Sequence, residues 1–279
     1  MKRQSIIISV SILSICIIGL FSFVPAPVNA AGSIKILWEG YANDINERSQ
    51  VVGQDFTSGA AVMWDEGKMI TLWENGEAKA INNRGQVVGQ DFTSCTAVMW
   101  YKGKTITLWE DGAAKAINDP GQVAGTVVTK WGDFPRIWDK GITTTLGFVK
   151  VGEESLIAIN NRGQVVGNLN SGIGWLWFES MLSTLPLRTS GINDPGQIVG
   201  QDSGAAVMWD NGEMVTLWEN GEANAINNRG QVVGQDSGAA VMWDKGKMIT
   251  LWENGEAKAI NNRGQVVGQD AGAAVMWEK

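Results

Sequence analysis

The chain repeats one segment of about 34 residues along most of its length. Residues 192–225 and 226–259 are identical at 27 of 34 positions. An Ile-Asn-x-x-Gly-Gln anchor returns at positions 45, 81, 117, 159, 192, 226 and 260, with serine in place of glycine in the first copy. The spacings are 36, 36, 42, 33, 34 and 34 residues. Such periods are typical of solenoids, propellers and other arrays, in which neighbouring units bury a shared core.

Each unit contains four short segments that are typical of β-strands. Examples are residues 231–235, 239–244, 247–252 and 257–261, which are rich in Val, Ile, Thr and Trp. Gly, Asn, Asp or Ser bounds each segment, as expected for strands joined by tight turns. No window keeps a helical period over ten residues. We therefore expect an all-β fold with four antiparallel strands in each unit.

The two ends of the chain indicate how the units are arranged. Four-stranded units of this length are typical of propeller blades, and a ring avoids the exposed sheet edges of a flat stack. The last unit stops after its third strand at 273–279, while residues 33–40 match the missing fourth strand. We predict a seven-bladed β-propeller of four-stranded blades, closed by the N-terminal strand completing the last blade. A solenoid is the alternative, and it would need capping units that the sequence does not show.

The turn between the first and second strands has a defined chemistry. It reads Asn-Asn-Arg-Gly in four units and Asn-Asp-Pro-Gly in two. Proline fixes φ near −65°, and glycine follows where a positive φ is favoured, which predicts a type II turn. Ser49 replaces the glycine in the first unit, so we expect the backbone of that turn to be the most strained.

Tryptophan recurs at two strand positions. The third strands carry Trp64, Trp100, Trp138, Trp177, Trp209, Trp243 and Trp277, and the fourth strands carry Trp38, Trp73, Trp109, Trp218 and Trp252. One interpretation is a set of aromatic platforms for sugars. We favour packing between neighbouring blades, because a residue repeated at one place in every copy is more often structural. Burial of Trp243 would make its replacement by alanine cost about 3–5 kcal/mol.

The first thirty residues form a candidate export signal. Lys2 and Arg3 precede an apolar run over residues 6–24, and small residues precede the expected cleavage after Ala30. An uncleaved membrane anchor is the alternative, since the run approaches the spanning length. We expect a signal peptide at 1–30 and a single propeller domain at 31–279, secreted or displayed at the cell surface.

Charge and cysteine content narrow the range of partners. Residues 31–279 contain 20 basic and 29 acidic residues, a formal charge of −9. Nucleic acid and anionic membrane surfaces need a basic footprint, so neither is an expected partner once the signal is removed. Cys95 is the one cysteine after the signal, which excludes an internal disulfide there. We expect a monomer that is stabilised by packing.

The residue pattern of the repeats is similar to that of a known family. The segment "INNRGQVVG" followed by "AAVMWDKGKMITLW" resembles the HAF-repeat family of probable extracellular repeat proteins, over about residues 33–279. The His-Ala-Phe triplet that names the family is absent, and the sequence has Ala239-Ala240-Val241 at that place. The resemblance implies an exported repeat protein and no defined activity.

The sequence offers few groups for catalysis. Histidine is absent, which excludes histidine bases, Ser-His-Asp systems and most zinc sites. The acidic residues recur in every unit, mostly beside turn glycines, and no dense Asp-x-Asp-x-Asp loop suggests calcium. We therefore expect no catalytic residues, no metal and no cofactor. A carbohydrate-active hydrolase or lyase that uses paired Asp and Glu is the alternative.

The third and fourth units depart most from the repeat. They contain the ligand-binding candidates Lys130, Trp131, Asp133, Phe134, Arg136 and Trp175. An insertion adds Lys150, Glu153 and Glu154. Loops on a rigid scaffold often carry binding residues, although these units could equally be older repeats that have diverged. We predict a non-catalytic binding or scaffold module for an extracellular glycan or surface protein, with passive surface display as a further possibility.

Overall fold

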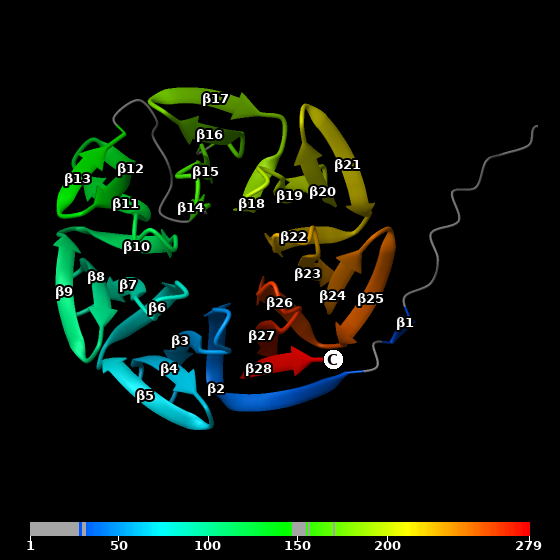
Figure 1. Cartoon of the computed structure of the whole chain (residues 1–279), viewed down its shortest axis with the longest axis horizontal. Coiled ribbons are helices and arrows are strands. Elements are labelled where there is room, and N and C mark those ends of the chain that lie inside the picture. The colour runs from blue at the N-terminus through cyan, green and yellow to red at the C-terminus, as the bar shows by residue number, and fades with distance from the viewer. Residues whose placement is uncertain (1–27, 30–31, 147–154, 156, 170) are drawn as a thin grey trace, which may run out of the picture.

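The computed structural model describes residues 28–29, 32–146, 155, 157–169 and 171–279. Every regular element in this part of the chain is a β-strand, and the sheets stand around a common centre (Figure 1). The predicted all-β fold is therefore confirmed. Within the same residues, no helix is long and apolar enough to cross a membrane. The signal peptide predicted at 1–30 lies almost wholly outside the described residues.

Most sheets contain four antiparallel strands that follow one another in the sequence. One consists of β6 (Gly76–Ile81), β7 (Val87–Asp91), β8 (Thr96–Tyr101) and β9 (Lys104–Trp109). The next consists of β10 (Gly112–Ile117), β11 (Val123–Thr129), β12 (Gly132–Asp139) and β13 (Ile142–Thr145). Then come β14 (Ile157–Ile159), β15 (Val165–Asn168), β16 (Gly174–Phe178) and β17 (Met181–Leu185). These are followed by β18 (Arg188–Ile192), β19 (Ile198–Asp202), β20 (Ala205–Asp210) and β21 (Glu213–Trp218).

Two sheets hold additional strands. One contains β22 (Gly221–Ile226), β23 (Val232–Asp236), β24 (Ala239–Asp244) and β25 (Lys247–Trp252), with the short β1 (Val28–Asn29) parallel to β25. The other runs in the order β26 (Gly255–Ile260), β27 (Val266–Asp270), β28 (Ala273–Glu278), β2 (Ser33–Ile45), β3 (Val51–Asp55), β4 (Ala61–Asp65) and β5 (Lys68–Trp73).

Strand β2 joins the two ends of the chain. Its first part lies antiparallel to β28, with Ser33 opposite Glu278 and Glu39 opposite Ala273. Its second part lies antiparallel to β3, with Gly40 opposite Asp55 and Ile45 opposite Val51. In Figure 1 β2 follows the outside of β28 and then turns toward the centre beside β3. The pairing predicted between residues 33–40 and the strand at 273–279 is thus present.

The core lies between neighbouring sheets. In each sheet the first strand lies nearest the centre and the fourth lies at the periphery (Figure 1). The second strands are buried on both faces, as Val87 and Val88 show with no exposed surface, which explains their continuous apolar sequence. Met63 and Leu72 of one sheet pack with Ile81 of the next in a shared cluster. Each sheet therefore depends on its neighbours for burial.

Tryptophans at the ends of the fourth strands connect adjacent sheets. Trp73 ends β5, is buried, and donates its indole N–H to the carbonyl oxygen of Gln90 in the next sheet at 3.0 Å. The equivalent bonds, each 2.9 Å long, join Trp38 to Gln54, Trp109 to Thr126, Trp218 to Gln235 and Trp252 to Gln269. These residues bear out the packing interpretation, because each buries its ring between two units and satisfies its only polar group.

The tryptophans of the third strands are less uniform than predicted. Trp64 and Trp277 are buried, but the others remain partly accessible, and these are Trp100, Trp138, Trp177, Trp209 and Trp243. These partly accessible rings still pack against the core clusters between the sheets, in agreement with the predicted structural role. The fourth-strand position is enclosed, because its side chain reaches across the next sheet.

A glycine in each second strand allows this close approach. A Cβ added to Gly89 would lie 2.0 Å from the carbonyl oxygen of Glu77 and 3.0 Å from the ring of Trp73. Any side chain there would push the inner strand and the tryptophan apart. The glycine of the Val-Val-Gly segment is therefore required by space and not by backbone conformation.

The turns between first and second strands differ from the predicted type II. The N–H of Gly85 donates to the carbonyl oxygen of Asn82 at 3.0 Å, so the glycine is the fourth residue of the turn. It has the positive φ, 77°, whereas a type II turn places positive φ at the third residue. The geometry matches a tight turn followed by a left-handed glycine. Ser49 adopts the same region with φ 62°, which bears out the expected strain in the first turn.

We expect the two tryptophan positions to differ in their contribution to stability. Trp252→Ala removes a buried ring and its hydrogen bond to Gln269 and should lower the free energy of unfolding by about 3–5 kcal/mol. Trp243→Ala, at the partly accessible position, should lower it by about 1–2 kcal/mol, less than the sequence predicts. Urea unfolding followed by circular dichroism measures both. Equal losses would contradict this assignment.

Candidate functional site

The inner strands surround a channel that has two different openings. Each inner strand contacts the next in the order β2, β6, β10, β14, β18, β22, β26, and β26 contacts β2. At one end the anchor residues line a cavity of about 170 Å³, which we call the narrow opening. At the other end the starts of the inner strands line a cavity of about 830 Å³, which we call the wide opening.

A belt of asparagines closes the narrow opening. Each anchor asparagine donates through Nδ2 to the backbone oxygen of the next anchor asparagine, at 2.9–3.1 Å. Within the described residues the belt consists of Asn46, Asn82, Asn118, Asn160, Asn193, Asn227 and Asn261. The last bond runs from Asn261 to Asn46, so the circuit returns to its start.

Every asparagine of the belt is also bonded within its own turn. The second Nδ2 hydrogen of Asn82 goes to Oε1 of Gln86 at 2.8 Å, and its Oδ1 accepts from the N–H groups of Arg84 and Gln86. Where proline replaces the arginine, the glycine N–H substitutes, as from Gly121 to Asn118 at 3.1 Å. These buried amides have no free hydrogen-bonding capacity, so the belt is structural and not a ligand site.

A second circuit lies outside the belt, on the surface. The N–H of each residue after the anchor asparagine donates to the side chain of its counterpart in the next unit, at 2.8–2.9 Å. Asp119 and Asp194 also accept from neighbouring asparagine amides, as Asp119 does from Asn83 at 2.9 Å. Glu47, Asp119 and Asp194 give the narrow opening an acidic lining without a basic residue.

The wide opening is lined by residues that a backbone irregularity turns toward the axis. The pairing of β6 with β7 shifts register between Ala78 and Ala80, so Lys79 is the extra residue of a β-bulge. The same shift brackets Lys115 in β10 and Lys258 in β26. Bulges often re-aim a side chain next to a functional site. Here they direct one residue from nearly every inner strand into the cavity.

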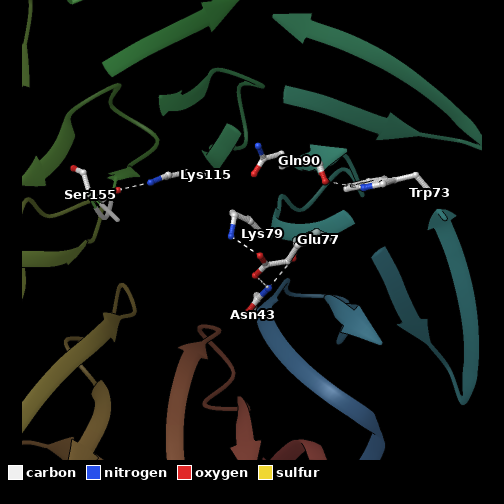
Figure 2. Close-up of polar contacts among 8 residues, drawn as sticks. Asn43, Trp73, Glu77, Lys79, Gln90, Lys115 and Ser155 are labelled. Atoms are coloured by element: carbon white, nitrogen blue, oxygen red, sulfur yellow. Dashed lines mark hydrogen bonds and ion pairs between the residues drawn. The ribbon is translucent and has the colours of Figure 1, made fainter. Parts of the chain in front are cut away.

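The bulge residues connect each sheet to the next. Figure 2 shows Asn43 beside Glu77, where its Nδ2 donates to Oε1 of Glu77 at 2.8 Å and to the carbonyl oxygen of Ala78 at 2.9 Å. Lys79 forms a 2.6 Å ion pair with the other oxygen of Glu77. Lys115 reaches the carbonyl oxygen of Ser155 at 2.7 Å. The wall of the wide opening is therefore fixed by polar contacts.

Exposed apolar residues lie on the hairpins at the same end of the sheets as the wide opening. The hairpins that join the second and third strands of each unit lie at the opposite end of the sheets from the asparagine belt. Three of them carry Phe56, Phe92 and Trp131, which are 47%, 39% and 68% exposed. Tyr41 contacts Phe56 edge to face at 4.6 Å. The later units have serine or alanine in the shorter hairpins at Ser203–Gly204, Ser237–Gly238 and Ala271–Gly272. The apolar rim therefore covers one side only.

The structure supports Lys130 and Trp131 as surface residues. Both lie at the tip of the β11–β12 hairpin, which is longer than its counterparts, and the Lys130 ammonium lies 4.9 Å from the Trp131 ring centroid. Thr129 holds the tip by accepting from the N–H of Trp131 at 3.1 Å. Val128, three residues earlier, lines the wide opening. The hairpin thus places an exposed aromatic ring near the cavity.

Other candidates occupy different environments. Trp175 is 1% exposed and packs with Ile137 and Val165, so its ring does not lie on the surface as a platform. Its indole N–H is buried and has no partner among the described residues. Phe134 is partly buried and packs against the cluster that contains Trp109.

Asp133 and Arg136 lie on β12 and are partly buried. Arg136 donates through Nε to Thr145 at 3.0 Å, and burial lowers its pKa from the ordinary value. Neither residue lines one of the two openings. The insertion residues Lys150, Glu153 and Glu154 lie outside the described residues.

The sequence does not single out the bulge residues or Arg188 as site residues. Lys79, Lys115 and Lys258 are single positions in an otherwise apolar strand, and their recurrence two residues before the anchor isoleucine is the signal that could have identified them. Arg188 stands where three other units have glutamate. The recurring lysine and the arginine at a glutamate position indicate a site only when the structure shows that a bulge turns these side chains toward a common axis.

Asp44 is a partly buried acid near the end of the inner strand β2. Its carboxylate accepts from the N–H of Ile45 at 2.8 Å and from the N–H of Ile81 in the next sheet at 2.9 Å. Five other units have alanine at this place, and one has glycine. Burial raises the pKa of Asp44 to about 7, despite the two backbone hydrogen bonds, which lower it.

Metal and thiol chemistry find no support in the described residues. No group of three or more Cys, Asp or Glu side chains there could hold a metal ion. Cys95 is exposed at a hairpin with a positive φ of 54° and has no charged partner in the described part of the chain. The catalytic possibilities therefore rest on carboxylates.

No protein-family model matches the chain, and no curated protein matches its sequence. Solved structures resemble it in fold. One is a catalytically inactive histidine-to-alanine variant of virginiamycin B lyase from Staphylococcus aureus with quinupristin, with a TM-score of 0.67, 11% identity, and coverage of 89% of this chain and 99% of that chain.

A second solved structure is YCF48 bound to D1 peptide, with a TM-score of 0.64, 12% identity, and coverage of 92% and 99% of the two chains. A putative gluconolactonase gives a TM-score of 0.53 at 9% identity, over 89% and 92%. At these identities the likeness defines the fold alone. The protein is a β-propeller, and its similar structures include both enzymes and a binding protein.

The belt should contribute strongly to stability. Asn261→Ala leaves the carbonyl oxygen of Asn46 and the N–H groups of Arg263 and Gln265 without their partner. We expect a loss of about 3 kcal/mol or more in the free energy of unfolding, since each unsatisfied buried group costs about 1–3 kcal/mol. Asn262→Ala removes a bond on the surface and should cost about 1 kcal/mol. Urea unfolding compares them, and similar losses would contradict the structural role of the belt.

Asp44 should make stability depend on pH. Because its pKa is raised in the folded state, the folded protein favours the protonated form. Its stabilising effect is fully present below the unfolded pKa near 4 and is lost as the pH rises through about 7. Asp44→Ala should therefore gain stability relative to the wild type between pH 4 and 8, by up to about 4 kcal/mol.

Thermal unfolding across this pH range measures the difference. Asp55→Asn provides a control of opposite sign, because the hydrogen bond from Ser58 lowers the pKa of Asp55. Its loss should reduce stability above pH about 4. If the difference in stability between Asp44→Ala and the wild type did not change with pH, the pKa of Asp44 would not be raised by folding.

Proposed function

We propose that the chain is an exported, non-catalytic binding module that holds an extracellular glycan or a surface protein on the face of the wide opening. One observation carries this proposal: Phe56, Phe92 and Trp131 are exposed on adjacent hairpins beside an open, polar cavity of about 830 Å³. Exposed aromatic residues on the hairpins of a rigid scaffold are typical of binding surfaces.

The proposal includes a seven-bladed, closed ring. Support comes from the seven anchors, from the shared strand β2 and from the circuit of the asparagine belt. A closed ring keeps the hairpins at fixed positions, which reduces the conformational entropy lost on binding. A monomer provides the whole surface, because the cavity and the rim belong to one chain.

Binding without catalysis is favoured by the state of the carboxylates. Glu77 and Glu222 line the wide opening, but both oxygens of Glu77 are engaged, one by Asn43 and the other by Lys79. A hydrolase needs one carboxyl group free to donate a proton. The alternative of a hydrolase or lyase with paired Asp and Glu predicts turnover that is lost in Glu77→Gln or Glu222→Gln.

Export and family membership complete the proposal. The apolar run at 6–24 and the small residues before Ala31 support a cleaved signal peptide, and the resemblance to HAF repeats points to the same extracellular location. N-terminal sequencing of the secreted protein tests this directly. An N-terminus at Ala31 is expected, and an intact Met1 would support the membrane anchor.

Ligand binding should depend on the aromatic rim. On a glycan array and in a pull-down with cell-surface proteins, the chain from Ala31 should retain a ligand, and Trp131→Ala should weaken binding about tenfold or more, as expected for a hot-spot ring. Ile142→Ala, which removes an exposed apolar residue from the outer strand β13, is the matched control and should bind as the wild type does.

Two results would count against the binding function. An empty array together with an empty pull-down at millimolar ligand would remove it. Equal weakening by Trp131→Ala and Ile142→Ala would show that the wide face is not the binding surface.

A further inference from the structure

We infer that the wide opening binds an acidic saccharide, whose carboxylate or sulfate group lies among Lys79, Lys115, Arg188 and Lys258 while its sugar ring stacks on Trp131. This inference rests on the proposed function and deepens it by assigning the charge of the ligand and the residues that read it. Each of the four basic residues comes from a different sheet.

The wide opening is basic in a chain that is acidic overall. Its lining has four basic residues and two acidic ones, Glu77 and Glu222, whereas the formal charge of the whole chain is −7. The narrow opening at the other end of the same axis has Glu47, Asp119 and Asp194 and no basic residue. Charge is therefore separated along the channel, and an anion is attracted specifically to the wide end.

The basic residues are positioned by the backbone and not by chance on a flexible surface. Lys79, Lys115 and Lys258 are bulge residues at one place of three inner strands, and the bulge aims each of them at the axis. Lys79 is held by Glu77, and Lys258 by Glu256, both at 2.6 Å. These pairs fix the ammonium groups while leaving further N–H donors for a ligand, since each ammonium has three.

Arg188 is the group with unused capacity. It begins β18 and lines the wide opening, and its guanidinium has no hydrogen bond or ion pair with any described residue. It stands at the position of Glu77, Glu222 and Glu256 in other units, so the charge is reversed at this one place. A planar guanidinium with five donors suits bidentate binding of a carboxylate or sulfate.

The rest of the lining suits a polyhydroxylated molecule. Asn43, Gln90, Thr126, Ser190 and Asn224 present donors and acceptors around the cavity. Val128 lines the same cavity and leads to the exposed ring of Trp131 at the hairpin tip. An apolar ring beside a charged polar cavity matches a sugar with an acidic substituent better than an apolar ligand, which would leave these polar groups unpaired.

The test begins with a glycan array of carboxylated and sulfated oligosaccharides, each paired with its methyl-esterified or desulfated counterpart. The chain from Ala31 should retain acidic members at least tenfold more strongly than their neutral counterparts. Comparison of the carboxylated with the sulfated oligosaccharides identifies which anionic group the protein binds. A peptide library with free C-terminal carboxylates serves as the other class of anionic ligand.

Variants then locate the interaction by calorimetry with the strongest acidic member. Arg188→Gln should weaken binding about tenfold or more, and 0.5 M salt should weaken the wild type further than the variant. Lys104→Gln removes the same charge from the exposed outer strand β9 and should leave the affinity within about twofold. Circular dichroism melting of each variant confirms that it remains folded.

The outcomes separate this inference from the proposed function. Binding of neutral counterparts as strong as that of acidic members, or unchanged affinity of Arg188→Gln, would overturn the acidic-saccharide assignment while leaving a binding module. Retention of peptides but no saccharide would likewise overturn it. Loss of all binding to glycans and proteins would remove the binding function itself.

Discussion

The hydrogen bond from each anchor asparagine to the backbone of the next unit is the interaction on which the rest of the structure depends. It joins the inner strands of neighbouring units at one end of the channel. The circuit includes Asn261 and Asn46, which are far apart in the sequence but joined by a hydrogen bond. Because the amides are buried and fully bonded, breaking one bond exposes several polar groups at once.

The belt also explains why the two ends of the channel differ. At the narrow end the belt side chains bond to the backbone of the next unit and within their own turns, so they offer a ligand no free donors or acceptors. At the wide end the inner strands bulge, and residues such as Lys79 and Asn43 reach neighbouring strands while still lining an open cavity. The asparagine belt and the proposed binding surface therefore lie at opposite ends of the same strands, which allows the rim to vary without loss of the fold.

The sequence predicts the fold well because the repeat marks each strand and turn in every copy. The partner of the first strand follows from the missing fourth strand of the last unit, and the pairing of Ser33–Glu39 with β28 agrees with it. The turn type is predicted wrongly, since the position of the positive φ depends on which N–H closes the turn. The exposure of Trp243 is missed because periodicity cannot tell which of two tryptophans reaches the next sheet.

The candidate site is only partly predictable. Trp131 stands out in sequence as an aromatic residue in an irregular hairpin, and it is exposed. Trp175 stands out equally, yet the fold buries it. Lys79, Lys115, Lys258 and Arg188 are separated by many residues and become one site only when the ring brings the inner strands together. Residues that meet through tertiary structure leave no local signal.

The most direct test of the ring is hydrogen–deuterium exchange of the whole chain, read in the segment Ser33–Glu39. This segment occupies the same outer position against β28 that Lys68–Trp73 occupies against β4. If the first strand completes the last sheet, both segments should exchange slowly and at similar rates under native conditions. Rapid exchange of residues 33–39 beside slow exchange of 68–73 would show that the ends are not joined and would contradict the account.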